Sequence, residues 1–226
     1  MIKKIDILGI QIDNYSVNET MLLVENYLNA TVMNTIEIIS TEMIVLAKSD
    51  TTLKECIENL DLAIIGEKEL LTEAKVASVS RIRETMNKDF FTEFMKRIIR
   101  NNKTVYLLCD TGAQTKQTES YLLTHYEKLI IVGSYSVEDC TGDIDTAINE
   151  MNIAAPDIIL SLLPTPEQEY FLSENKGKIG AIIWLGLGQD YMRHKKMDRI
   201  RKIVKKCMNR SMLRHMMLKY KEENKM

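Results

Sequence analysis

The sequence predicts an α/β fold, in which a doubly wound, mostly parallel, Rossmann-like sheet is followed by a basic helical appendage. Three observations predict it. Short apolar runs recur along the first 186 residues, helical segments separate them, and a basic helix replaces this alternation near residue 190. Continuously apolar strands joined through helices are typical of parallel strands buried on both faces. We therefore expect a Rossmann-like domain over residues 1–190 and an amphipathic appendage over residues 191–226.

The first half of the chain opens with a strand or hairpin at IDILGIQI, followed by a helix from Ser16. There S-V-N-E supplies a capping box, in which Glu19 reaches back to the cap. A second capping box is expected at Thr52, in T-L-K-E. The alternation continues with strands TIEII (35–39) and DLAII (61–65) and with helices after Thr41, after residue 65 and across 89–102.

The second half repeats the pattern, with strands TVYLLC (104–109), KLIIVG (128–133), DIILSLL (157–163) and AIIWLG (181–186) and helices between them. In LLPTPEQE, Thr165 is expected to cap a helix that begins at Pro166, with Gln168 completing a capping box. The same geometry would also direct backbone N–H groups at a bound phosphate, so the loop is open to both interpretations.

The net charge of −2 hides a strong division along the chain. Residues 1–192 hold 17 Lys and Arg against 29 Asp and Glu, whereas residues 193–226 hold 13 against 3. A basic tail on an acidic body predicts an anionic partner, which could be a membrane surface, a nucleic acid or the body of a neighbouring subunit. Because the tail has few aromatic residues and the body is acidic, nucleic acid is not expected.

Other classes of protein are disfavoured. No stretch approaches the ~18 apolar residues of a membrane span, and the first residues lack a secretory core, so a cytoplasmic protein is expected. The four cysteines lie 31 or more residues apart without a CxxC pair. We expect reduced, structural thiols, no metal site and no cofactor.

Candidate functional residues lie in the loops after the strands, since ligands of open α/β sheets bind beyond the carboxyl ends of the strands. These loops span residues 40–42, 66–67, 109–112, 164–169 and 186–190. Gly186 and Gly188 form a lone GxG, which alone gives weak support for nucleotide binding and is more typical of a tight turn.

With these loops collected, the chain resembles the WecG/TagA/CpsF glycosyltransferases over nearly its whole length. LGIQIDNYS is similar to the family's LG-x-x-ID-x-x-(S/T), and TEMIVLAKSDTTLKECIENLDLAI to its NAEM…A…D…L…ADL segment. VYLLCDTGAQTKQTESYL resembles VFLLGG-x-x-G and the helix after it. LLPTPEQEYF is similar to G-x-PKQE-x-W, and WLGLGQDY to the GVGG-x-FD turn.

The resemblance implies a metal-independent, inverting transferase that makes cell-surface polysaccharides or teichoic acids. Such an enzyme moves an N-acetylhexosamine-type sugar, such as N-acetylmannosamine, from a UDP-sugar to a polyprenyl-linked acceptor at the inner face of the cell membrane. Substrate binding is assigned to Ser40, Glu42, Gln168, Glu169, Gly186 and Gly188. Of these, Glu42, Gln168 and Glu169 agree with the family pattern, as does Asp190, which is assigned to catalysis.

The departures from the family pattern fall mostly on polar groups. The strand-end aspartate regarded as general base aligns with Gly66, and the Lys of PKQE with Glu167. The Thr-x-Asn, Arg-x-Thr-Gly and paired-glycine elements are also altered, at Ile38 and Ser40, at 84–87 and at 109–110. Glu67, one residue further on, could take the base's role. The alternative is a catalytically silent relative that acts as a partner or regulator of an active transferase.

The tail has the profile of an interfacial helix, because Ile200, Val204 and Met208 are spaced four apart among basic residues. Membrane contacts are assigned to Arg199, Lys202, Lys205, Lys206 and Arg210. The alternatives are packing on the protein's own acidic body or on a second copy, so that a homo-oligomer or a complex with an active transferase stays open.

Overall fold

The computed structural model describes residues 4–139, 144–192 and 196–223, and in the last helix it describes side chains from Cys207 onward. In these ranges eight strands form one sheet in the order β1-β2-β4-β3-β8-β7-β5-β6. Their bounds are β1 Lys4–Ile7, β2 Ile10–Asp13, β3 Asn34–Ile39, β4 Leu62–Ile65, β5 Thr104–Cys109, β6 Ile130–Ser136, β7 Ile158–Leu162 and β8 Ile183–Gly186. All neighbouring pairs are parallel except β1 and β2, which confirms the predicted fold class.

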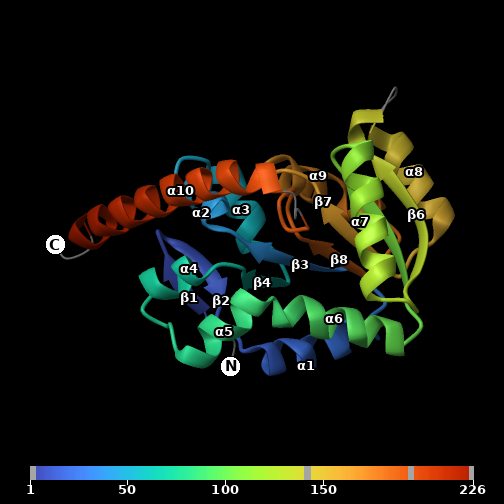
Figure 1. Cartoon of the computed structure of the whole chain (residues 1–226), viewed down its shortest axis with the longest axis horizontal. Coiled ribbons are helices and arrows are strands. Elements are labelled where there is room, and N and C mark those ends of the chain that lie inside the picture. Colours follow the sequence, from blue (N-terminus) through green and yellow to red (C-terminus); the bar gives the residue numbers. More distant parts are fainter. Residues whose placement is uncertain (1–3, 140–143, 193–195, 224–226) are drawn as a thin grey trace.

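Helices cover both faces of the sheet (Figure 1). Their bounds are α1 Val17–Tyr27, α2 Thr41–Ala47, α3 Thr51–Glu58, α4 Lys68–Glu73, α5 Val79–Asn87, α6 Asp89–Arg100, α7 Gly112–His125, α8 Ile144–Ala154, α9 Glu167–Asn175 and α10 Lys196–Glu223. One buried cluster joins the sheet to α1, α6 and α7, and the other joins it to α2, α3, α8, α9 and α10.

The inner strands are mostly apolar because each face of the sheet has its own core. In β7, for example, Ile159 belongs to one buried cluster, and Ile158 and Leu160 belong to the other. Side chains alternate between the faces of a strand, so a strand covered on both sides reads as a continuous apolar run. In β3 this run is interrupted by Glu37, which is fully buried.

The first two strands form a tight hairpin, which is one of the two alternatives that the sequence left open. Leu8 and Gly9 both have positive φ, 57° and 82°, as a two-residue hairpin turn of the favoured hand requires. Asp13 then attaches the hairpin to β4, because its Oδ2 accepts a hydrogen bond of 2.9 Å from the Ala63 backbone N–H.

Of three helix caps predicted from the sequence, at Ser16, Thr52 and Thr165, the first is confirmed and the other two are wrong. The capping box of Ser16 and Glu19 is present. The capping box predicted at Thr52 is wrong, because the Asp50 side chain accepts from the Leu53 N–H and α3 begins at Thr51. The predicted cap at Thr165 is also wrong. Its hydroxyl instead donates to Glu169 Oε1 at 3.0 Å, and α9 begins only at Glu167.

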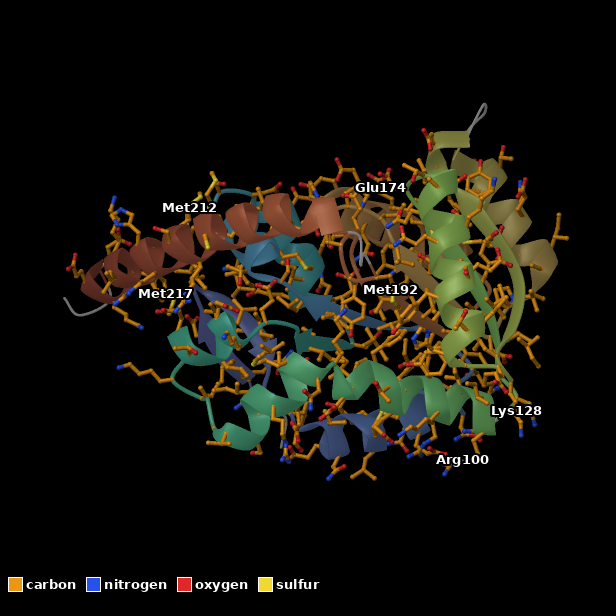
Figure 2. All side chains as sticks on the ribbon, viewed as in Figure 1. Arg100, Lys128, Glu174, Met192, Met212 and Met217 are labelled. Carbon is orange, nitrogen blue, oxygen red and sulfur yellow. The ribbon has the colours of Figure 1, made fainter. Side chains whose placement is uncertain are left out.

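The appendage helix α10 lies along α2, on the same side of the sheet as α3 and α9 (Figure 1). Leu213 and Met217 are buried against the main body, whereas Met212 lies on the outer side of α10 (Figure 2). Lys48 of the α2 end lies 5.1 Å from the Tyr220 ring centroid. In the part of α10 whose side chains are described, the appendage therefore packs on the protein's own main body.

Candidate functional site

A cleft of about 500 Å³ lies beyond the carboxyl ends of β3, β4, β7 and β8. It is bounded by the loops that follow these strands, by the end of α5 and by Asn209 of α10. The carboxyl edge is where ligands of open α/β sheets bind, and the cleft has the volume of a typical small-molecule site.

Several predicted site residues are brought together in this cleft. Ser40, Glu42, Glu67, Gly188 and Asp190 all line it, although they come from three loops far apart in the sequence. Local structure explains why serine and glycine occupy two of these positions. Ser40 caps α2 by accepting from the Met43 N–H at 3.2 Å, and Gly188 has φ +77°, which favours glycine.

Three further predicted residues lie beneath the floor of the cleft. Gln168 and Glu169 are 1% and 2% exposed, and neither they nor Gly186 lines the cleft. Gly186 allows this layer to pack closely, because an added Cβ would lie 2.7 Å from both Gln168 Nε2 and Glu37 Cγ. Because none of the three lines the cleft, any effect they have on substrate binding would pass through the residues that form its floor.

Glu67 occupies the start of α4 and faces the end of the neighbouring strand. Its Oε2 accepts a 2.6 Å hydrogen bond from the hydroxyl of Thr41, which begins α2 and is 2% exposed. This bond joins the loops after β3 and β4 and fixes the carboxylate at the wall of the cleft.

Gly66 has little room for any side chain. A Cβ at this position would lie 2.4 Å from Ile38 Cγ2 and 2.9 Å from the Ile39 carbonyl oxygen. The Gly66 N–H donates to that same carbonyl at 2.9 Å, which holds the two strand ends close together. The position aligned with the family's aspartate is therefore closed by both a side chain and the backbone.

The described side chains of the cleft carry an excess of negative charge. Four carboxyl groups line it, at Glu42, Glu67, Glu69 and Asp190, against two ammonium groups, at Lys68 and Lys88. Such a lining repels a diphosphate unless further cations approach, and the first half of α10 has a sequence rich in basic residues. Its side chains before Cys207 lie outside the described residues.

Sequence reasoning missed three of these lining residues, Lys68, Glu69 and Lys88. Lys88 has φ 57° between α5 and α6, and its Nζ donates to the Tyr191 carbonyl at 2.5 Å. The same Nζ lies 3.9 Å from the Tyr191 ring centroid, so it ties this junction to the loop after β8. Only the tertiary structure reveals this contact, because the two residues are 103 positions apart.

The loop after β5 was predicted as part of the candidate site but does not line the cleft. It is instead connected to the loop after β8 by side-chain amides. Gln189 Nε2 donates to Asp110 Oδ2 at 2.8 Å, and Gln114 Nε2 donates to the Gln189 carbonyl at 2.9 Å. This loop therefore supports a wall of the cleft from outside.

Two buried carboxyl groups beneath the floor are strongly perturbed. Burial, followed by repulsion from Glu169, raises the pKa of Glu37 well above its ordinary range. Burial likewise raises the pKa of Glu169 to about 7. The charged residue inside the apolar run TIEII was the sequence signal for Glu37, although it does not reveal what surrounds the side chain.

Of the predicted membrane contacts, the side chains of Arg199, Lys202, Lys205 and Lys206 lie outside the described residues, while Arg210 is exposed. Within the described ranges, no helix combines the length and apolarity needed to cross a bilayer. Nor does any group of three or more His, Cys, Asp or Glu among the described side chains form a possible metal site.

An open, mostly parallel sheet defines a Rossmann-like protein, and the cleft lies at the edge where ligands of such folds bind. Residues 5–191 match the model of the glycosyl transferase WecG/TagA/CpsF family. Because the match covers most of the chain, the protein belongs to this family. No match was found among curated proteins.

Proposed function

We propose that the protein transfers an N-acetylhexosamine-type sugar from a UDP-sugar to a lipid-linked acceptor in the synthesis of a cell-surface polymer. Membership of the family supports this proposal, and so does the cleft of about 500 Å³ at the carboxyl edge of the sheet. The single observation that carries it is the Glu67 carboxylate, which Thr41 holds at the cleft wall beside the closed position of Gly66.

Glu67 is the proposed general base of an inverting transfer. Oε2 accepts from Thr41, so Oε1 can accept the proton of the acceptor hydroxyl. As the acceptor oxygen bonds to the anomeric carbon, the bond from that carbon to the diphosphate oxygen breaks, and UDP leaves with the electron pair. A positioned base typically contributes about 10²- to 10⁴-fold in rate.

The other predicted residues take binding and supporting roles. Ser40, Glu42, Gly188 and Asp190 line the cleft walls. They are proposed to contact the sugar and the acceptor, and Asp190 is proposed to orient the reacting hydroxyl. Gln168, Glu169 and Gly186 support the floor from beneath.

The lipid-linked acceptor requires contact with a membrane, for which α10 is the proposed surface. Met208, Met212 and Leu218 are 60%, 44% and 57% exposed on this helix, and Arg210 and Arg214 are exposed beside them. Exposed apolar and basic side chains on one helix suit reversible attachment to an anionic leaflet, at about 1 kcal/mol per basic residue. Since UDP-sugars are cytoplasmic donors, the proposed location is the inner face of the cell membrane.

Attachment can be tested by co-sedimentation with anionic vesicles. Reversing Arg210 and Arg214 to Glu should release the protein, while reversing the exposed Lys128, at the far end of the sheet from α10 (Figure 2), should not. Equal binding by both variants would contradict the role of α10.

The catalytic proposal is tested by product formation from a UDP-sugar and a lipid-linked acceptor. We expect Glu67→Gln to lower turnover by about 10²-fold or more while the protein stays folded. Glu73→Gln, at the other end of α4 and outside the cleft lining, serves as the matched control. Full turnover by Glu67→Gln would remove Glu67 from the mechanism.

A second candidate is a non-catalytic relative that binds an active transferase or another copy of itself. The closed position at Gly66 and the acidic lining of the cleft favour it. This candidate predicts no turnover by the wild-type protein with any UDP-sugar, together with co-purification of an active relative. Turnover that depends on Glu67 would exclude it.

A further inference from the structure

A second cavity, of about 270 Å³, lies on the side of the sheet covered by α3 and α9. Thr35 and Glu37 of β3 form its base, Cys56 and Asn59 lie on the α3 side, and α9 supplies Glu169 and Ser173. None of these residues lines the large cleft, so the two cavities are distinct. We call this space the lower cavity.

The inner wall of the lower cavity carries two carboxyl groups from different elements. Glu37 is 0% exposed and Glu169 is 2% exposed. Both oxygens of Glu37 and Oε2 of Glu169 are buried without a hydrogen-bond partner among the described residues. Buried acceptors of this kind are costly, so three on one wall indicate that a donor belongs between them.

The existing cation near the cavity does not serve these oxygens. Lys176 Nζ lies 3.0 Å from Asp61 Oδ2 and 3.4 Å from the Thr35 hydroxyl. Its ammonium group is thus held at Asp61, and it makes no hydrogen bond to the unpartnered oxygens of Glu37 and Glu169. The other walls carry the aliphatic Leu60 and Leu172 beside the polar groups, which suits a small carbon skeleton.

We propose that the lower cavity binds a small primary amine, whose ammonium group donates to Glu37 and Glu169 and whose carbon skeleton packs between α3 and α9. A primary ammonium has three donors, which equals the number of unpartnered oxygens. An anionic ligand would face two acids. Water could fill the volume, but it supplies no positive charge, so it would not favour ionisation of the two carboxyl groups as an ammonium would.

The titration behaviour agrees with this assignment. Burial raises the pKa of both carboxyl groups, and repulsion from Glu169 adds to the rise for Glu37. The Trp184 indole N–H lies near enough to oppose that rise, but it makes no hydrogen bond and leaves both Glu37 oxygens without a partner. A bound ammonium would lower both pKa values, because an opposite charge at hydrogen-bond distance favours the ionised form. Amine binding should therefore release protons near neutral pH.

Thermal unfolding with ethanolamine as the probe, and ethylene glycol as its uncharged analogue, tests the proposal. Ethanolamine should raise the Tm saturably and slow the alkylation of Cys56, which lines the lower cavity, as followed by mass spectrometry of each cysteine. Ethylene glycol should do neither. The proposal does not depend on transferase activity, and neither measurement requires a UDP-sugar.

Two variants locate the amine. Glu37→Gln should weaken binding by about 10- to 100-fold, the loss expected for a charged hydrogen bond. Ser173→Trp, at an exposed position of the cavity wall, should block entry without altering the core. Glu67→Gln, in the large cleft, should leave the response unchanged. Equal shifts with ethylene glycol, unchanged binding in Glu37→Gln, or no protection of Cys56 would each overturn the proposal.

Discussion

Replacing Glu169 by Gln should make the protein more stable at alkaline pH while leaving its stability at acidic pH nearly unchanged. The carboxyl group is 2% exposed beneath the cleft floor, and burial raises its pKa from 4.5 to about 7. A carboxyl group with a raised pKa binds its proton more tightly in the folded than in the unfolded protein. Its stabilising contribution is therefore fully present below pH 4.5 and is lost as the pH rises through about 7.

The magnitude follows from the difference between the two pKa values. One pKa unit corresponds to about 1.4 kcal/mol, so the free energy of unfolding should fall by about 3 kcal/mol across this window because of Glu169 alone. Glu37 contributes in the same direction, since its pKa is also raised. The amide introduced by Glu169→Gln cannot ionise and can still accept from Thr165, so the variant should avoid the loss due to Glu169.

Urea unfolding followed by circular dichroism between pH 5 and pH 8 measures this difference. We expect the wild type and Glu169→Gln to have similar stability at pH 5 and to diverge by about 3 kcal/mol at pH 8. Glu174→Gln, at an exposed position of the same helix, is the matched control and should follow the wild type. Parallel curves for the wild type and Glu169→Gln would refute the reasoning.

Three further predictions concern the packing at Gly186, the packing of α10 and the cap of α1, and urea unfolding measures all three. Gly186→Ala should cost about 1 to 3 kcal/mol, because the new Cβ would lie 2.7 Å from Glu37 Cγ; wild-type stability would contradict the close packing. Leu213→Ala should cost about 3 kcal/mol and expose α10 to proteolysis, whereas Leu218→Ala, at a 57% exposed position, should do neither; equal effects would refute the packing of α10. Ser16→Ala should cost about 1 kcal/mol through loss of the capping box, and no loss would show that the cap is dispensable.

Much of the fold could be predicted from local patterns. Continuous apolar runs such as DIILSLL indicate strands covered on both faces, and β7 lies within that run at Ile158–Leu162. Helix starts were harder, since several residues near Thr52 can act as caps. Asp50 prevails there because its side chain reaches the Leu53 N–H at 3.0 Å.

The candidate site could be predicted only in part. Membership of a strand-end loop places Glu67 and Asp190 at the right edge of the sheet, and both line the cleft. Loop membership does not predict how deeply a side chain is buried, and Gln168 lies beneath the cleft floor rather than in its wall. Lys88 joins the site through Tyr191, a contact between distant segments that has no local signal.

Calorimetric titration with UDP tests most directly whether the cleft binds the donor. We expect saturable binding with one site per chain, weakened several-fold by Lys68→Glu at the exposed cleft wall. Lys128→Glu makes the same charge change far from the cleft and should bind like the wild type. No heat of binding at millimolar UDP, or equal weakening by the two variants, would contradict a donor site between β3, β4, β7 and β8.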